Sequence, residues 1–212
     1  MTSQSKNPAE QANQILDSTP MNWDELIALL APQLTKIAHE SSIALISKLE
    51  LDKGLFGKVS PKLAFIARQR AAELVGKRVL ADGRIIDNPD PKWAISQSTR
   101  SMLKTTVTRA IDEGWTAQQL RKEIVDSYGF SSSRALMIAR TERSLMANRA
   151  EHETALASQV IKLKQWTTSE SDVVCEVCSD NDQVAIPLDS SFPSGDSFPP
   201  AHPNCSCSLS YS

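Results

Sequence analysis

Five side chains that can bind a metal ion lie in two short stretches of the sequence. "DVVCEVCSD" contains Cys175 and Cys178, and "PPAHPNCSCSLSYS" contains His202, Cys205 and Cys207. A Cys-x-x-Cys turn lets two thiolates reach one ion, and His-x-x-Cys or Cys-x-Cys supplies the remaining ligands, as in structural zinc sites. The sequence therefore predicts a structural zinc ion held by four of these five residues.

The sequence leaves the ligand set open. Either all four cysteines bind and His202 forms a hydrogen bond nearby, or His202 replaces Cys205 or Cys207. Reduced thiols without metal and disulfides are the alternative interpretations. A catalytic zinc would need an open coordination position and a general base. Five candidate donors favour a closed site, and the chain has no P-loop, nucleophile elbow or GxGxxG motif. We therefore expect no enzyme activity and no catalytic residues.

Charge is unevenly distributed along the 212 residues. The chain has 23 basic and 25 acidic residues and a net charge of −2. No Lys or Arg follows Lys164, whereas seven acidic residues do, so the C-terminal part is strongly acidic and the rest is basic. Because phosphate binding needs Lys and Arg, the C-terminal part is a poor DNA clamp. Basic residues in the helical part are interpreted as solvated helix faces.

The first residues, "MTSQSKNPAEQANQ", are polar, and no stretch of the sequence is apolar enough for a membrane span. We expect neither a signal peptide nor contact with a membrane. A reducing cytoplasm is therefore predicted as the site of synthesis, and it favours metal-bound cysteines over disulfides.

The elements that must position these residues change in character along the chain. Residues 1–20 are polar and predict a flexible arm. Apolar residues at three- and four-residue spacing then predict a body of four or five helices. The helices are expected from residue 22 to about 50, from Ser60–Pro61 to about 79, over 93–113, from a capping box at Thr116–Gln119, and from serines 131–133 to about 158.

After residue 158 the sequence favours short strands. "QVIKLKQWTT" is rich in β-branched residues, with Ile161 and Leu163 predicted on one face, and "QVAIPL" alternates in a similar way. Two short strands with long loops bury little apolar surface, so a metal is expected to stabilise them. The predicted fold class is α+β, with a mainly helical body and a small C-terminal β module stapled by a zinc-type Cys/His site.

The stretch from about residue 114 to Cys207 resembles the phage head morphogenesis domain of the phage Mu F-like minor head proteins. The similarity rests on "GWTAQQLRKEI", "SSSRALMIARTERSLMANRA", "QWTTSESDVVCEVC" and "VAIPLDSSFPSGDSFPPAHPNC", in this order. It implies a helical N-terminal region over 21–113 and a Mu F-like domain over 114–212, with 159–212 as its Cys/His β module. Its "IARTE" segment contains Arg140, Thr141 and Glu142.

The chain departs from the family pattern at three places. The family usually has a glycine in the turn occupied here by Asn181-Asp182-Gln183, and often one before the strand, where this chain has Ser158-Gln159. Because asparagine can take the left-handed conformation, the first of these turns is compatible with Asn181. Between the last two cysteines, Ser206 replaces the usual arginine. None of these changes removes a metal ligand.

The resemblance implies a minor head protein of a tailed phage or prophage that acts by binding. Implied partners are the portal protein, the major capsid or scaffolding protein and possibly packaged DNA. The implied location is the virion, in the head interior or at the portal vertex. During assembly the implied location is the host cytoplasm. A zinc-containing nuclease and a DNA-binding regulatory protein are the alternatives.

Within the family motif we expect a buried helix face. The expected apolar stripe consists of Leu136, Ile138, Ala139, Leu145 and Met146. The charge distribution also suggests that Arg140 pairs with acidic residues of the C-terminal module.

Overall fold

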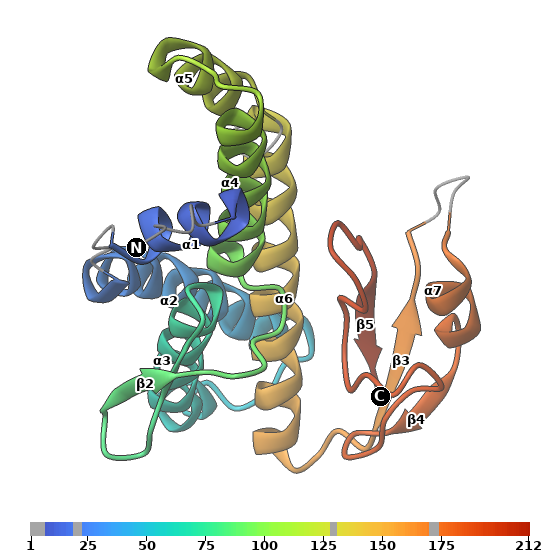
Figure 1. Ribbon diagram of the computed structural model, residues 1–212. Helices are drawn as coiled ribbons and strands as arrows, with labels where there is room; N and C mark the ends of the chain where they lie inside the picture. Colours follow the sequence, from blue (N-terminus) through green and yellow to red (C-terminus); the bar gives the residue numbers. More distant parts are fainter. Residues whose placement is uncertain (1–6, 19–22, 128–130, 170–173) are drawn as a thin grey trace. The chain divides into compact units, whose positions relative to one another are not determined.

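The computed structural model describes residues 7–18, 23–127, 131–169 and 174–212. Most of them form helices, and a small antiparallel sheet lies in the C-terminal part (Figure 1). The mainly helical class with a small C-terminal sheet is therefore confirmed. The helices are α1 (Pro8–Ser18), α2 (Trp23–Lys48), α3 (Leu55–Leu74), α4 (Ile95–Asp112), α5 (Ala117–Asp126), α6 (Ser132–Ser158) and α7 (Glu176–Asn181). The strands are β1 (Lys77–Val79), β2 (Ile85–Asp87), β3 (Leu163–Thr167), β4 (Ala185–Pro187) and β5 (Ser208–Tyr211).

The chain packs as two compact units, each built from two separate stretches. Unit 1 consists of residues 1–27 and 72–136, and unit 2 consists of residues 28–71 and 137–212. These units are defined by packing and differ in extent from the domains predicted from the sequence, whose boundary was placed at residue 114. All five candidate metal ligands belong to unit 2.

Unit 1 contains two features that the sequence analysis missed. Within the predicted flexible arm, Pro8–Ser18 form α1, which packs against α4, so this part of the arm is helical. The stretch "ADGRIIDNPDP", expected as turns, contains β2, which pairs antiparallel with β1 and places Val79 opposite Ile85. Gly83 lies between the two strands with φ of 85°, a conformation that residues with a Cβ atom rarely adopt.

The helix boundaries follow local hydrogen-bonding signals. The predicted capping box of α5 is confirmed, because the Thr116 hydroxyl accepts a hydrogen bond from the Gln119 N–H at 3.2 Å. By contrast, α3 begins at Leu55, before the predicted start at Ser60. The Asp52 carbonyl accepts a hydrogen bond from the Leu55 N–H at 3.0 Å, and this local turn starts the helix earlier than the Ser-Pro signal suggested.

The C-terminal module (residues 159–212) is built on the sheet β4–β3–β5, in which both outer strands run antiparallel to β3 (Figure 1). Trp166 of β3 is fully buried, and its ring packs edge-on against Phe192 with centroids 5.0 Å apart. Around this pair lies a cluster completed by Cys178, Cys205, Cys207 and Leu209. The module therefore has a small apolar core of its own, with three of the cysteines inside it.

Strand β3 buries a lysine side chain, which the sequence pattern did not predict. Ile161, just before the strand, is buried, whereas Leu163 is 41% exposed. Lys164 is 1% exposed, and its Nζ donates hydrogen bonds to the carbonyls of Leu188 and Ser197, both at 2.8 Å. Burial lowers the pKa of Lys164 to about 8. The two carbonyls compensate for the loss of water around the ammonium group.

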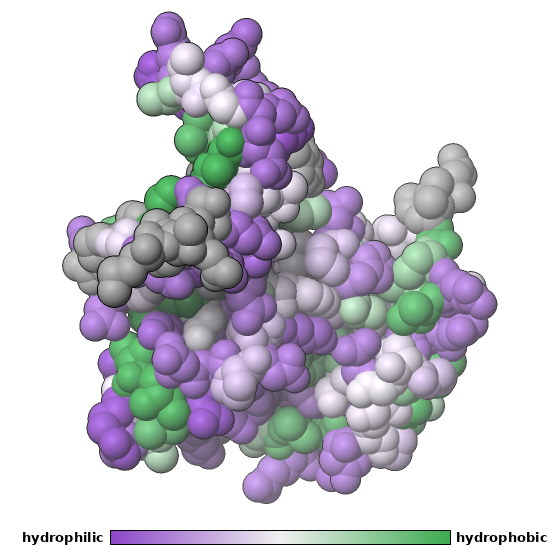
Figure 2. All heavy atoms as spheres, in the orientation of Figure 1, coloured by the Kyte–Doolittle hydropathy of each residue, from purple (hydrophilic) through white to green (hydrophobic). Residues whose placement is uncertain are grey.

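The face visible in Figure 2 is covered mainly by hydrophilic side chains, with apolar ones in small groups. Among the residues that the structure describes, no helix combines the length and the apolar character needed to cross a membrane.

Candidate metal centre

The first pair of cysteines is placed by the start of a short helix. Cys175 directly precedes α7, and Cys178 lies within its first turn. The Ser179 N–H donates a hydrogen bond to the Cys175 carbonyl at 2.9 Å, which closes that turn. Residues three apart on a helix lie on the same face, so the two thiols can approach one ion. Cys175 is exposed and Cys178 is buried.

The second half of the site is a tight turn from His202 to Cys205. The Cys205 N–H donates to the His202 carbonyl at 3.3 Å, and Asn204 has a left-handed φ of 63°. Asparagine adopts this conformation more readily than most residues. His202 Nδ1 lies 2.9 Å from the Pro203 carbonyl, which can only accept, so Nδ1 carries a proton. In the neutral ring, Nε2 then has the free lone pair with which histidine binds a metal.

The two halves meet around the His202 imidazole. Its Nε2 lies 3.1 Å from the Cys175 sulfur and 3.4 Å from the Cys178 sulfur, which in turn lies 3.7 Å from the Cys205 sulfur. The donors form two groups of three that share Cys178, one with Cys175 and His202 and one with Cys205 and Cys207. Within each group all donor atoms lie within 4.8 Å of one another. These residues, predicted as ligands, are thus brought together and could hold a metal ion.

The spacing of the donors fits a tetrahedral ion. With zinc–sulfur bonds of about 2.3 Å and zinc–nitrogen bonds of about 2.0 Å, a regular tetrahedron has S···S and S···N separations of about 3.8 and 3.5 Å. The three measured distances of 3.1, 3.4 and 3.7 Å are close to these values. Sulfur donors with one imidazole nitrogen are also the ligand chemistry of structural zinc.

Just over half of the chain matches a known protein family. Residues 101–210 match the family described as Phage Mu protein F like protein. The chain belongs to this family. It is a family of phage head morphogenesis proteins and is not a known enzyme family. The match begins at residue 101, before the region from residue 114 that carries the sequence resemblance. A search of curated proteins and a search of solved structures each found no match.

Hydrogen bonds among the thiols of this Mu F-like protein decide which sulfur loses its proton most easily. The neighbouring Cys207 side chain lowers the pKa of Cys205 to about 5, and the Cys205 side chain in turn raises the pKa of Cys207. A hydrogen bond from the Cys178 backbone lowers the pKa of Cys175, whereas burial raises the pKa of the Cys178 thiol to about 12. A bound cation would oppose that effect of burial, because it stabilises the thiolate.

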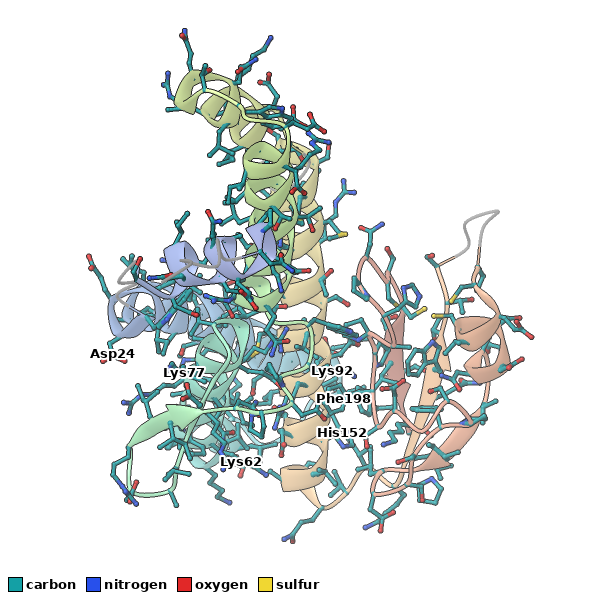
Figure 3. All side chains as sticks on the ribbon, in the orientation of Figure 1. Asp24, Lys62, Lys77, Lys92, His152 and Phe198 are labelled. Carbon is teal, nitrogen blue, oxygen red and sulfur yellow. The ribbon has the colours of Figure 1, made fainter. Side chains whose placement is uncertain are left out.

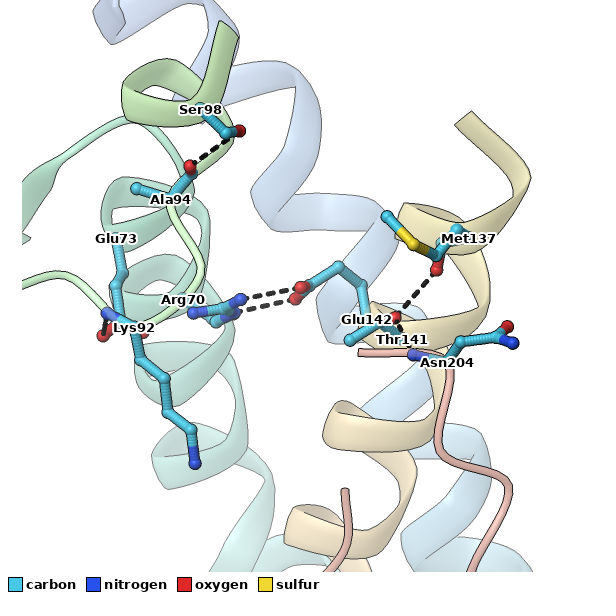
Figure 4. A network of polar contacts seen from close by, with 9 residues as sticks. All are labelled: Arg70, Glu73, Lys92, Ala94, Ser98, Met137, Thr141, Glu142 and Asn204. Atoms are coloured by element: carbon cyan, nitrogen blue, oxygen red, sulfur yellow. Dashed lines mark hydrogen bonds and ion pairs between the residues drawn. The ribbon is translucent and has the colours of Figure 1, made fainter. Parts of the chain in front are cut away.

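The family motif at residues 140–142 faces in two directions. Arg140 is exposed, whereas Thr141 and Glu142 are buried. The Glu142 carboxylate accepts two hydrogen bonds from the Arg70 guanidinium, each 2.7 Å long (Figure 4). The Thr141 hydroxyl accepts a hydrogen bond from the Asn204 N–H at 2.9 Å. Arg70 is therefore not on a solvated helix face as predicted, and no local pattern in the sequence marks it as the partner of Glu142.

The inward face of α6 is more polar than predicted. Of the five residues in the expected apolar stripe, only Met146 is buried, and Leu136 is half exposed. The buried polar residues of α6 within unit 2 are Thr141, Glu142, Asn148, His152 and Thr154.

The suggested pairing of Arg140 with acidic residues of the module is not seen between described residues. No ion pair among them includes Arg140. The residue instead lines a shallow pocket of about 350 Å³ together with Arg143, Asn204, Cys205 and Ser206. Arg140 therefore lies beside the second half of the metal centre.

His152, interpreted from the sequence as an ordinary helix residue, packs against the C-terminal module. Its ring lies beside that of Phe198, with centroids 5.5 Å apart (Figure 3). Nδ1 is buried and has no hydrogen-bond partner among the described residues. Burial lowers the pKa of His152 to about 4, and the positive charge of Lys164 acts in the same direction. The imidazole is therefore neutral at physiological pH and serves packing.

Two departures from the Mu F-like pattern fall on strained backbone. Gln159 has φ of 60° and Gln183 has φ of 57°, and each lies where the family usually has a glycine nearby. Asparagine can take the left-handed conformation, but Asn181 ends α7 and Gln183 adopts that conformation instead. In both turns, glutamine adopts a left-handed conformation that glycine takes without strain.

Proposed function

We propose that this protein is a minor head protein of a tailed phage or prophage. It joins the assembling procapsid, associates with the portal, contacts the major capsid or scaffolding protein, and supports DNA packaging or delivery. It is then carried in the virion, in the head interior or at the portal vertex. The observation that carries the proposal is the family match over residues 101–210. The protein acts by binding, since the family is not a known enzyme family.

In this proposal a structural zinc ion is bound by Cys175, Cys178, His202 and Cys205. Support comes from the short distances that link these four donors. Cys207 is not a ligand in this proposed set, although its sulfur lies within 4.8 Å of those of Cys178 and Cys205. The ion would join α7 to the His202–Cys205 turn, so metal binding contributes to the folding free energy of the module.

Metal content separates this ligand set from the alternatives. The full chain, purified without chelator, should contain one zinc ion per chain by mass spectrometry, with thiols that react only after chelation. C178S should lose the ion, whereas C207S should retain it with reduced affinity. If C207S loses zinc as completely as C178S, the assignment of Cys207 is wrong. If the wild-type protein contains no metal and four reactive thiols, the zinc site itself is refuted.

Co-sedimentation tests the role in the head. The chain should sediment with procapsids that contain the portal of the same phage and much less with procapsids assembled without it. Equal binding to both would place the contact on the capsid or scaffolding protein and refute the portal association. The absence of binding to either would refute the minor-head assignment.

The same preparations test the two alternative functions. A zinc nuclease would cleave DNA when Mg²⁺, Mn²⁺ or Zn²⁺ is added, and a regulator would shift a specific DNA duplex in a gel at physiological salt. We expect neither result. Either result without procapsid binding would replace the proposed function.

A further inference from the structure

One backbone N–H connects the metal centre to the helical part of unit 2. Asn204 lies between His202 and Cys205, two of the proposed ligands, and its left-handed φ of 63° sets the direction of the turn. Its N–H donates to the Thr141 hydroxyl of α6 at 2.9 Å (Figure 4). The turn is therefore fixed at the residue whose backbone conformation determines how the two ligands point.

Thr141 is itself held in a single orientation. It is 3% exposed, and its hydroxyl donates to the Met137 carbonyl at 2.8 Å, so a lone pair faces Asn204. The next residue, Glu142, is fixed by the two hydrogen bonds from Arg70. This turn of α6 can neither rotate nor slide without breaking a buried ion pair. Thr141 is thus a fixed acceptor for the Asn204 N–H of the ligand-bearing turn.

We infer that Thr141 is a positioning residue of the metal site: it holds the His202–Cys205 turn in the binding geometry and so couples metal binding to the docking of the C-terminal module on α6. The inference rests on the proposed zinc site. Groups that hydrogen-bond to the ligand shell of a metal typically contribute a factor of 10–100 to metal affinity. Because coupling between two binding events is reciprocal, bound metal also stabilises the contact between the turn and α6.

The test compares three variants of the full chain. T141V keeps the shape of the side chain but removes the acceptor, and T141S keeps the acceptor. T35V is the matched control, because the Thr35 hydroxyl makes the same bond to the carbonyl four residues earlier, at 2.8 Å to Ala31, in a helix of the same unit. Zinc affinity is measured by competition with a chromophoric chelator, and Co²⁺ binding is followed through the thiolate charge-transfer band.

We expect about a tenfold loss of zinc affinity and an altered cobalt spectrum for T141V, with T141S and T35V close to the wild type. If T141V does not fold, as judged by circular dichroism, T141A replaces it with the same expectation. Wild-type affinity in the folded variant that lacks the hydroxyl, or an equal loss in T35V, overturns the inference and leaves the zinc site intact. Failure of the wild-type protein to bind either metal overturns the zinc site together with the inference.

Discussion

Replacing Arg70 by methionine should destabilise unit 2 far more than the loss of an ordinary ion pair. The side chains of Arg70 and Glu142 are 3% and 9% exposed, and two hydrogen bonds of 2.7 Å join them. R70M retains most of the aliphatic volume but leaves the Glu142 carboxylate buried without its cation. Removing one partner of a buried pair costs about 3–5 kcal/mol, so we expect a loss of this size in the free energy of unfolding.

The assay is urea unfolding followed by circular dichroism, at neutral pH and fixed zinc concentration. K36M is the control, because the Lys36–Glu40 pair is exposed, with atoms 3.9 Å apart, and should contribute less than about 0.5 kcal/mol. The double variant R70M/E142L removes both charges and should recover most of the loss, as apolar replacements of buried pairs often do. A loss below about 1 kcal/mol in R70M, or a double variant no more stable than R70M, would refute the reasoning.

Three further predictions concern unit 2. The fragment 101–212, which corresponds to the family match, should lack cooperative unfolding, because residues 28–71 complete its compact unit; native-like unfolding of this fragment would contradict this. Gln159→Gly and Gln183→Gly should each raise the free energy of unfolding by about 0.5–1 kcal/mol by relieving left-handed φ, whereas Gln165→Gly in a strand should lower it. Since folding lowers the pKa of His152 from 6.5 to about 4, the unfolded chain binds more protons between these values, and stability should fall as pH decreases through this range. The urea midpoint of H152L should depend less steeply on pH.

Several features formed by residues close together in the sequence were predicted correctly. The capping box at Thr116 placed α5, and helical periodicity placed α4 and α6 within a few residues of their observed bounds. The Cys-x-x-Cys and His-x-x-Cys spacings identified the donors that the structure brings together. These features could be predicted because a helix cap or a pair of metal donors is formed by residues that are close together in the sequence. Strand β5 was missed because "SLSY" is short and half serine, and its pairing with β3 is long-range.

The polar face of α6 could not be predicted for a related reason. A buried Glu142 or Thr154 violates the apolar pattern unless its partner is known, and the partners lie far away in the sequence. Arg70 lies 72 residues from Glu142, and the Ser42 hydroxyl lies 2.8 Å from that of Thr154 across 112 residues. The spacing of apolar residues along the sequence does not indicate which distant residues form these pairs. The predicted apolar stripe assumed that the buried face of a helix is apolar. This assumption is wrong for α6, where buried polar side chains form hydrogen bonds instead.

These long-range contacts also connect the family motif at residues 140–142 to a part of the chain that lies outside the family match. The C-terminal module packs on α6, and α6 is in turn fixed by residues 28–71, which lie outside the match. Leu45 belongs to the same buried cluster as Ala155, Ile161 and Leu188, so α2 contributes to the core beneath the module. Thr141 contacts the His202–Cys205 turn and its neighbour Glu142 contacts Arg70 of α3, so the geometry of the candidate metal site depends on residues far upstream. Substitutions in α3 should then alter metal affinity without touching a ligand.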